Sequence, residues 1–311
     1  MILVMNKNMT SNTGSLFSKL QKTTSSMGLI MTAAIWGFAF VIVKDSLAHI
    51  GAVWMVAFRF TIAAVLLALC CVKKFSKLTA TYWKHGAATG LFLCAGYITQ
   101  TIGCNYTTAG KNAFLTTIYV ILIPLFCWPL YKKRPHSYVF IAALLSVTGI
   151  GLLALNNADG SLFTMNKGDM LTLVCGVFYA LHIISTAHCN RKDDPLLLTV
   201  LQFAFTSAFS WLCAPIIDGP LPVQGLCTPQ VVLSMLYLGM FSTLVGFVLQ
   251  NVCLKYVPPA LASLFLSLES VFGVLFSTLL LQEHLTLRMI AGCVLIFCAI
   301  VLAEVVPNIK R

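Results

Sequence analysis

The chain alternates between long apolar stretches and short polar connections, and ten of these stretches are about long enough to cross a bilayer. A membrane-spanning helix needs about 20 mostly apolar residues, whereas a spanning β-strand needs about 10 with alternating polarity. The stretches in this chain are longer and continuously apolar, which predicts helices that satisfy their own backbone hydrogen bonds in lipid. The predicted spans are 28–47, 52–72, 86–106, 111–131, 138–155, 168–189, 196–217, 230–252, 259–281 and 287–306.

Composition supports the same fold class. Hydrophobic residues make up 59% of the chain and charged residues only 9%, against about 25% charged residues in a soluble domain. No connection is long enough to fold as a domain, so the sequence predicts an all-α polytopic membrane protein. Residues 1–27 are polar and lack a small-residue cleavage site after a short apolar core, which predicts a disordered cytoplasmic tail rather than a cleaved signal peptide. Residues 307–311 form a second, short tail.

The basic residues predict an orientation. Fifteen of the 20 Lys and Arg residues lie in the terminal tails and in the loops on one side, four lie on the other side, and Arg59 lies within a span. Basic residues are retained in cytoplasmic loops, so both termini are expected in the cytoplasm, with a bacterial inner membrane as the default location. The net charge of +11 is therefore explained by topology and contact with anionic lipids, without a nucleic-acid partner.

Short echoes indicate an internal repeat. The segment Gln100–Tyr106 resembles Gln250–Tyr256 at an offset of 150 residues, and each leads through a short loop into another apolar helix. Phe58-Arg59-Phe60 resembles Leu201-Gln202-Phe203, and Gly37 in the first span resembles Gly176 in the sixth. The echoes follow the same order along the chain, which predicts two five-helix repeats, 28–155 and 156–306.

Because five is an odd number, the second repeat must enter the membrane from the opposite side to the first. Inverted repeats of this kind place a substrate site near the midplane, where the two halves meet, and rocking about that site gives alternating access. The repeat therefore favours a transporter.

Two charges lie well inside the predicted spans, Arg59 and Glu269. A charge at this depth costs about 2.5–3.5 kcal/mol on insertion scales, so each is expected to face a cavity or a partner. Arg59 has a structural interpretation, as an anchor for carbonyls near the outer end of its span. For Glu269, a proton relay or substrate contact and a structural tie between helices are both open, and a direct pair between the two charges is possible.

Uncharged polar and aromatic residues complete the candidate site. His182 lies three residues after Tyr179 on one helix face, and either titrates in transport or is a hydrogen-bonded packing residue. Amides commonly bridge helices, so ligand contact and helix bridging are both open for the matched pair Gln100 and Gln250 and for the neighbouring Asn251. Aromatic side chains are expected to line the cavity, namely Trp36, Phe40, Tyr97 and Tyr119. Pro124 can kink its helix, either as a gate or as a static bend.

Metal and cofactor chemistry is not indicated. Twelve cysteines are present, most of them inside spans, where they are expected to act as small packing residues. Cys227 alone lies in an outer loop, so no extracellular disulfide framework is implied. No His, Cys and carboxylate cluster has zinc-ligand spacing, and we expect neither a metal site nor a cofactor.

Several short motifs, in order, carry a family resemblance over residues 28–306. The first half contributes Trp36-Gly37, Phe58-Arg59-Phe60, the turn from Tyr106 to Ala113, and Pro124. The second half contributes Tyr256-Val257-Pro258-Pro259-Ala260, Leu268-Glu269-Ser270-Val271, Glu283-His284-Leu285-Thr286 and Ala291-Gly292. With these motifs, the chain resembles the drug/metabolite transporter superfamily, specifically its ten-helix EamA type.

The resemblance implies a central cavity lined by the first, third, fourth, sixth, eighth and ninth spans, and export or exchange of small metabolites, often amino acids. Three positions depart from the usual pattern of the family: Ala39 replaces a polar residue, Ser270 replaces proline and Gln282 replaces glycine. The change at Ala39 removes a polar group from the first span.

The predicted function is secondary transport of a small, amino-acid-like solute, with possible proton coupling, by a monomer or weak homodimer. A drug or nucleotide-type exchanger of the same fold is an alternative. Another is an intramembrane enzyme acting on lipid, but the sequence has no Gly-x-Ser-x-Gly elbow and no His-Glu-x-x-His pair. It also lacks a Walker-type phosphate loop, and a channel would need a ring of charges or carbonyls. The chain is therefore predicted not to be an enzyme.

Overall fold

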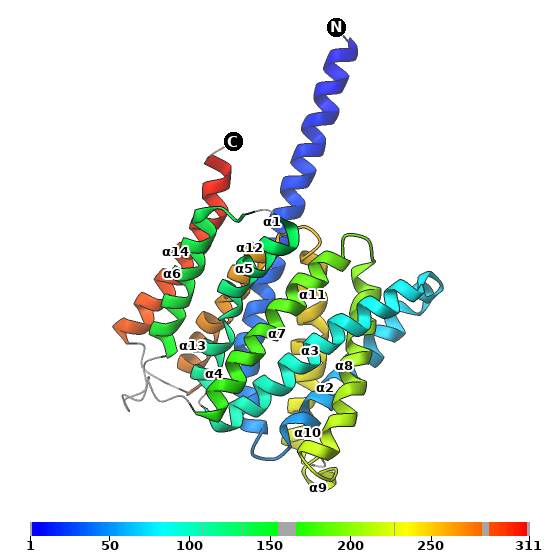
Figure 1. The fold of residues 1–311 in the computed structure, drawn as a ribbon, viewed down its shortest axis with the longest axis vertical. Coiled ribbons are helices and arrows are strands. Elements are labelled where there is room, and N and C mark those ends of the chain that lie inside the picture. Colours follow the sequence, from blue (N-terminus) through cyan, green and yellow to red (C-terminus); the bar gives the residue numbers. More distant parts are fainter. Residues whose placement is uncertain are drawn as a thin grey trace.

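The computed structural model describes residues 2–107, 109–132, 134–154, 166–226, 228–281 and 286–309. Over these residues the regular structure is entirely helical (Figure 1). The predicted boundary between the repeats, at 155 and 156, and most of the motif at 283–286 lie outside the described residues. The helices are α1 (Ile2–Ser46), α2 (Ala52–Cys71), the 3₁₀ helix η1 (Val72–Lys77), α3 (Ala80–Tyr106), α4 (Ala109–Thr116), α5 (Tyr119–Tyr131), α6 (Ser137–Ala154), α7 (Lys167–Cys189), α8 (Pro195–Ile217), α9 (Val223–Leu226), α10 (Pro229–Leu236), the π-helix η2 (Tyr237–Val245), α11 (Gly246–Cys253), α12 (Pro259–Leu266), α13 (Leu268–Leu281) and α14 (Leu287–Ile309).

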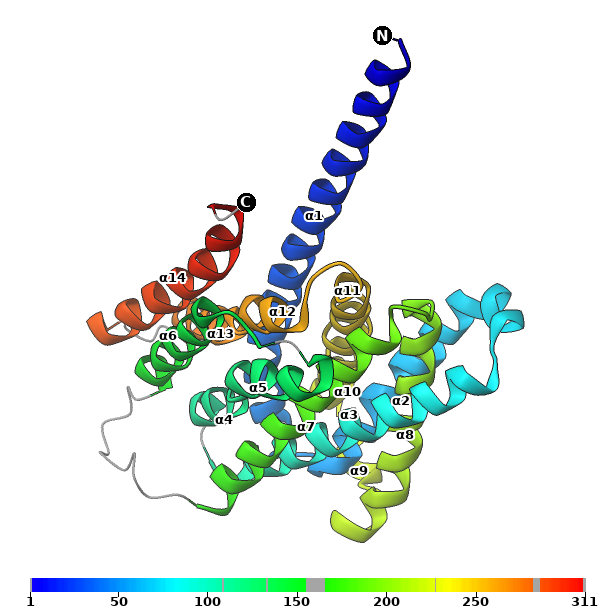
Figure 2. The same cartoon turned by 45° about the horizontal axis from the view of Figure 1, so that its top comes forward.

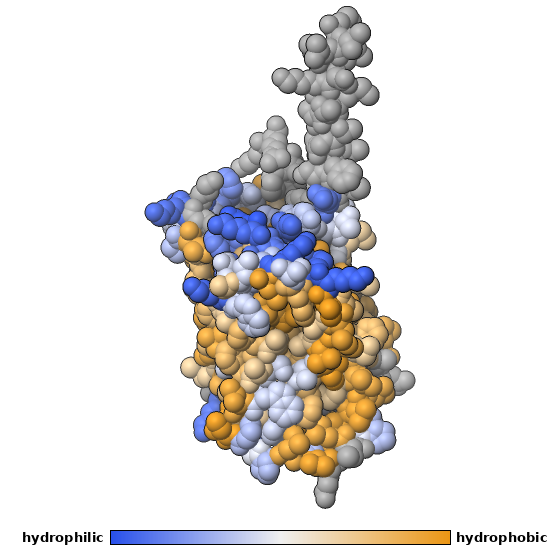
Figure 3. All heavy atoms as spheres, turned by 90° about the vertical axis from the view of Figure 1, so that its right-hand side faces the viewer, coloured by the Kyte–Doolittle hydropathy of each residue, from blue (hydrophilic) through white to orange (hydrophobic). Residues whose placement is uncertain are grey.

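Every predicted span coincides with apolar helix. Within the part of the chain that the structure describes, six helical stretches are long and apolar enough to cross a membrane, and four shorter apolar helices account for the fourth, fifth, ninth and tenth predicted spans. The side of the bundle is covered by apolar side chains, below a hydrophilic band at the end that carries the termini (Figure 3). The protein is therefore an integral membrane protein of the predicted all-α class.

The two ends of the bundle are distinguished by the chain termini. α1 enters the bundle, and α14 ends, at the upper end in Figure 1, which we call the terminal face; the other end is the opposite face. The structure is helical from Ile2, in place of the disordered tail predicted for residues 1–27. No proline interrupts the sequence between Ile2 and Ser46, so nothing in the backbone ends the helix before the first span. At the other terminus α14 continues to Ile309, beyond the end of the predicted tenth span.

The two halves pack as an inverted repeat. α1 runs from the terminal face to the opposite face, whereas α7, the first span of the second half, runs back towards the terminal face (Figure 1). Contacts between helices follow the same symmetry. The third span α3 packs on α7, as the equivalent α11 packs on α1. It also packs on α8, as the equivalent η2 packs on α2. The self-equivalent pairs α2–α8 and α6–α14 lie at opposite edges of the bundle (Figure 2).

Two glycines show the symmetry at atomic detail. A Cβ atom at Gly37 of α1 would lie 2.8 Å from the backbone oxygen of Glu269, and one at Gly176 of α7 would lie 2.9 Å from the backbone oxygen of Thr116. Gly37 thus lets α1 pack directly against the backbone of the ninth span, and Gly176 lets α7 pack against the backbone of the fourth span. The echo between Gly37 and Gly176 in the sequence corresponds to this packing.

The fourth and ninth spans each contain a one-turn break in the α-helical hydrogen bonding, where the backbone stays in helical conformation. α4 ends at Thr116 and α5 begins at Tyr119, while α12 ends at Leu266 and α13 begins at Leu268. The two breaks are related by the same 150-residue offset as the sequence repeat. At the first break the N–H of Val120 donates to the carbonyl of Thr117 at 2.9 Å, and at the second the N–H of Ser270 donates to the carbonyl of Ser267 at 3.2 Å, as in a 3₁₀ turn.

Candidate functional site

A central cavity lies between the two repeats, with a volume of about 70 Å³ open to the centre of a water molecule. This is enough for several waters or for part of a small solute, since one water needs about 10–15 Å³ by the same measure. Both repeats contribute to the walls. The lining residues are Trp36, Ala39, Phe40, Val43, Arg59, Tyr97, Gln100, Thr101, Cys104, Asn112, Thr116, Tyr119, Tyr179, His182, Ile183, Ser242, Phe247, Gln250, Leu266 and Glu269.

Nine of the ten residues proposed from the sequence as cavity-lining meet at this cavity. The exception is Asn251, which is fully buried away from it. Its amide nitrogen donates to Thr199 Oγ1 at 2.9 Å, and its backbone oxygen accepts from Asn190 Nδ2 at 2.7 Å. Asn251 was therefore wrongly expected at the cavity, because one step along a helix rotates a side chain by about 100° from its neighbour Gln250.

Glu269 lies at the break between α12 and α13 and is 5% exposed. The hydroxyl of Tyr119, at the equivalent position of the first repeat, donates to Glu269 Oε1 at 3.4 Å. Two equivalent positions can touch only next to the axis that relates the repeats, so this pair marks the symmetric centre of the cavity. Among the described residues, no basic side chain forms an ion pair with Glu269. A buried carboxyl without a cationic partner favours a proton or a cationic group of a ligand.

Arg59 forms another part of the cavity wall and is 3% exposed. Its Nε donates to Thr243 Oγ1 and its Nη2 to Ser242 Oγ, both at 2.8 Å, and its guanidinium lies 4.7 Å from the centre of the Tyr97 ring. The partners are hydroxyl groups of the π-helix η2 rather than the carbonyls expected from the sequence. Arg59 also adds the second span to the lining. A guanidinium has five N–H donors, so these two bonds leave donors for an anionic group.

A hydrogen-bonded chain connects three further lining residues. The hydroxyl of Tyr179 donates to Gln100 Oε1 at 2.8 Å, and Gln100 Nε2 donates to Thr116 Oγ1 at 3.2 Å. Gln100 therefore bridges helices and also faces the cavity, which matches the bridging interpretation, while ligand contact stays a prediction. Asn112 Nδ2 donates to the backbone oxygen of Gln100 at 3.1 Å, while the buried Asn112 Oδ1 is an acceptor with no protein partner among the described residues.

His182 is a hydrogen-bonded residue at the end of the cavity nearer the terminal face. Its Nε2 lies 3.2 Å from Gln202 Oε1 and 3.3 Å from Thr186 Oγ1, and its ring is 1% exposed. Gln250 lies nearby, and its amide donates to Asn251 Oδ1 at 3.4 Å. The contacts of His182 match the packing interpretation, whereas the contact of Gln250 with Asn251 lies within its own helix and does not bridge helices; both residues line the cavity.

Aromatic rings form the apolar part of the wall. Trp36 Nε1 donates to the backbone oxygen of Ser242 at 2.8 Å, and its ring lies 4.9 Å from that of Phe247. Tyr97 contacts Tyr179 edge-on at 5.7 Å between ring centres. The ring of Phe247 packs against rings from both halves, among them those of Trp36 and His182. The sequence did not single out Phe247, because nothing there separates it from other phenylalanines in spans.

Pro124 does not reach the cavity. It lies buried inside α5, beyond the break between α4 and α5, and the same helix contains Pro129. A gating role for Pro124 stays a prediction.

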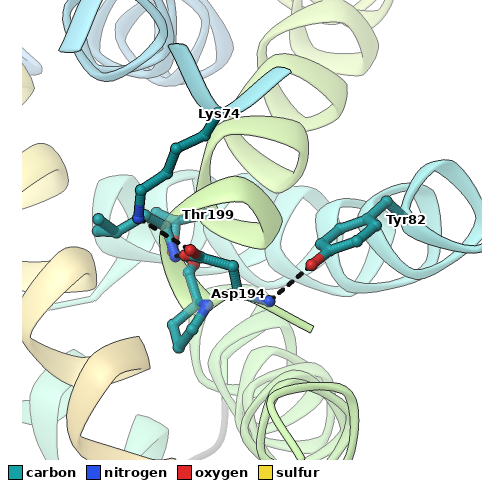
Figure 4. A network of polar contacts seen from close by, with 6 residues as sticks. Lys74, Tyr82, Asp194 and Thr199 are labelled. Atoms are coloured by element: carbon teal, nitrogen blue, oxygen red, sulfur yellow. Dashed lines mark hydrogen bonds and ion pairs between the residues drawn. The ribbon is translucent and has the colours of Figure 1, made fainter. Parts of the chain in front are cut away.

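The cavity is closed on the side of the terminal face. Buried polar side chains of Asn190, Thr199 and Asn251 pack beyond Gln250, and a network of charged residues lies further out. In this network, Lys74 of η1 and Tyr82 in the first turn of α3 reach Asp194, at the start of α8 (Figure 4). Lys74 Nζ lies 2.8 Å from Asp194 Oδ2, and the Tyr82 hydroxyl accepts from the Asp194 N–H at 2.8 Å. The two repeats are thus joined directly at this face.

The charge of Asp194 makes a testable contribution to stability. Burial works to raise the pKa of its carboxyl, but the hydrogen bonds from Lys74 and the Leu196 N–H outweigh burial and hold the pKa below its ordinary value. A lowered pKa stabilises the folded protein above the unfolded pKa, near 4, and this contribution is lost as the pH falls through the folded pKa. We expect Asp194→Asn to keep the helix cap but to lower stability at neutral pH by less than about 1 kcal/mol. The difference in melting temperature between the two proteins in detergent should shrink below pH 4; a difference that is constant from pH 3 to 7 would contradict this assignment.

The sequence profile of the EamA-like transporter family matches twice, at residues 24–155 and 166–304. An uncharacterized transporter of Archaeoglobus fulgidus is 32% identical over 92% of this chain and 87% of its own length. The uncharacterized transporter YvbV of Bacillus subtilis is 22% identical over 92% of this chain and 93% of its own. A crystal structure of a protein that is 17% identical superposes with a TM-score of 0.76 over 93% of this chain and 99% of that chain, which shows a shared fold.

The fold and the cavity define a polytopic membrane transporter built from two repeats. The chain belongs to the EamA-like transporter family. The resemblance read from the motifs is confirmed, and each match covers one of the two repeats.

Proposed function

We propose that the protein is a secondary transporter that moves a small, amino-acid-like solute by alternating access, as an exporter or exchanger. The observation that carries the proposal is one cavity, between inverted repeats, that holds two buried and mutually unpaired groups of opposite charge, Arg59 and Glu269. Desolvating a charged group is costly unless it meets a partner, so such a cavity suits a solute with both charges. The carboxylate of the solute would bind the free N–H groups of Arg59, and its ammonium group would bind Glu269.

The walls add selectivity for small side chains. Trp36, Tyr97 and Tyr179 offer ring faces to an apolar or cationic group, and Asn112 Oδ1 offers an unused acceptor. The absence of a polar group at Ala39, which lines the cavity, leaves this wall to the aromatic rings.

The closed terminal face indicates which state of the transport cycle the structure represents. The excess of basic residues supports a cytoplasmic location for the termini and this face, with a bacterial inner membrane as the default. The cavity extends from His182 and Gln250 near the middle of the bundle to Val43 and Cys104 near the opposite face, so it represents a state closed towards the cytoplasm. Reorientation would open the Lys74–Asp194 contact and expose the same residues to the other side. The unit of transport is a monomer or a weak homodimer, and Glu269 is the candidate for proton coupling.

The test is ligand-dependent stabilisation of the purified protein. We expect amino acids to raise the melting temperature saturably, by an amount equivalent to about 2.7 kcal/mol at 100 times the dissociation constant. Nucleosides, sugars and cationic drugs at matched concentrations should have no effect. Stabilisation by cationic drugs or nucleosides and not by amino acids would overturn the solute class, and a failure of the stabilising amino acid to exchange across sealed vesicles would overturn transport.

A further inference from the structure

Three side chains with metal-binding atoms meet at the terminal face, although they are far apart in the sequence. His85 lies near the start of α3, Cys189 is the last residue of α7, and Asp193 lies in the connection to α8. The ligand atoms of the three residues all lie within 4.8 Å of one another, and His85 Nδ1 is 2.5 Å from Asp193 Oδ2. The spacing in the sequence gave no sign of this cluster, because its members come from different repeats.

The backbone holds two of these ligands in place. The N–H of Asp193 donates to the backbone oxygen of Cys189 at 3.0 Å, which continues the helical turn and keeps the two side chains on one side. Cys189 and Asp193 are each 7% exposed, whereas the side chain of His85 is 29% exposed. Cys189 and Asp193 are therefore buried, and solvent reaches the cluster at His85.

We propose that His85, Cys189 and Asp193 form a binding site for a divalent transition metal, with Zn²⁺ the best suited. An imidazole nitrogen, a thiolate and a carboxylate are all zinc ligands, and this mixed set disfavours Mg²⁺ and Ca²⁺, which take oxygen ligands. Tetrahedral coordination at normal bond lengths places ligand atoms about 3.3–3.8 Å apart. Side-chain rotations that move the ligand atoms by about 1 Å reach that geometry. They separate His85 from Asp193 and bring Cys189 closer. The metal takes the place of the proton between His85 and Asp193, and water from the open side completes the shell.

A metal at this position would couple the two repeats. His85 belongs to the first repeat, and Cys189 and Asp193 belong to the second, next to the Lys74–Asp194 contact. Binding would hold the terminal face closed and slow the reorientation of the cavity. This consequence rests on the proposed alternating access, whereas the site itself does not.

The experiment uses the full-length purified protein, reduced and free of chelators, titrated with Co²⁺ and then with Zn²⁺. We expect one Co²⁺ per chain, with the absorption of a thiolate–cobalt bond, and displacement of Co²⁺ by Zn²⁺. Zn²⁺ should also raise the melting temperature of the protein. His85→Gln, Cys189→Ser and Asp193→Asn should each weaken Co²⁺ binding at least tenfold, and the thiolate absorption should vanish in Cys189→Ser.

Matched controls come from the same face. His136→Gln and Cys70→Ser change exposed residues outside the cluster and should leave binding unchanged. Cys189→Ser replaces one atom and keeps the His85–Asp193 pair, so it remains informative if His85→Gln weakens the fold. Absence of Co²⁺ binding to the wild-type protein, or equal binding by all five variants, would overturn the metal site. Neither result depends on a transport substrate, so transport could still be demonstrated independently.

Discussion

Replacing Glu269 with glutamine is expected to lower the affinity for a solute with an ammonium group by about 30-fold or more. Removing one partner of a buried, hydrogen-bonded charge pair costs about 2–5 kcal/mol, and Glu269 is the acidic residue of the cavity wall. Glutamine has nearly the same shape, so the hydrogen bond from Tyr119 and the break before α13 should persist. The measurement is the ligand concentration that gives half-maximal thermal stabilisation. If Glu269 also relays a proton, the exchange rate in vesicles should lose its pH dependence in the same variant.

Two further variants separate charge from hydrogen bonding. Tyr119→Phe removes only the hydroxyl that donates to Glu269, and it should weaken binding less than Glu269→Gln. Asp45→Asn removes a carboxylate that accepts from Gln230 at the opposite face, outside the cavity, and should leave binding unchanged. Unaltered affinity and unaltered pH dependence in Glu269→Gln would remove Glu269 from both roles.

A single methyl group added at Gly37 is expected to destabilise the protein by about 1–3 kcal/mol, the usual cost of overpacking. The new Cβ would lie 2.7 Å from the Cβ of Phe272 and 2.8 Å from the N of Gly273, and these atoms cannot move without displacing α13. Because Glu269 lies in the first turn of the same helix, the displacement should also weaken solute binding. The melting temperature of Gly37→Ala in detergent and its ligand affinity test both effects.

Gly273 supplies the matched control, because it faces Gly37 across the same contact. A Cβ at Gly273 would meet only the backbone oxygen of Gly37, at 3.7 Å, which is ordinary van der Waals contact. Gly273→Ala should therefore be tolerated, while Gly37→Ala should not. Equal melting temperatures for the two variants would mean that α1 and α13 are less closely packed than the structure shows.

The spans and their order were predictable from hydrophobicity alone. A helix in lipid must be apolar over about 20 residues, and this requirement leaves a signal that no tertiary contact alters. The pairing of the halves was also predictable, because Gly37 and Gly176, and Gln100 and Gln250, keep their order along the chain. Arg59 and Glu269 were identified as candidates because charge within a span is costly.

The errors arose where neighbouring helices decide the outcome. Asn251 and Gln250 are adjacent polar residues in one span, and only the packing of α11 shows that Gln250 alone faces the cavity. Neither the break before α5 nor the break before α13 contains a proline or a glycine, so the sequence carries no signal for them. Asn112 and Phe247 of the cavity wall also contact the other repeat: Asn112 Nδ2 donates to Thr172 Oγ1 at 2.9 Å, and the ring of Phe247 packs on those of Trp36 and Tyr97.

The sequence by itself determined that the chain is a bundle of membrane helices in two inverted halves, with two charges at depth. These features follow from composition and order, because the cost of placing polar groups in lipid applies to each segment separately. Only the tertiary structure decided which polar residues share one cavity, that Tyr119 meets Glu269 at the centre between the repeats, and that His85, Cys189 and Asp193 form a cluster. Those juxtapositions depend on how helices from different repeats rotate and pack against one another, which the order of residues along one helix does not specify.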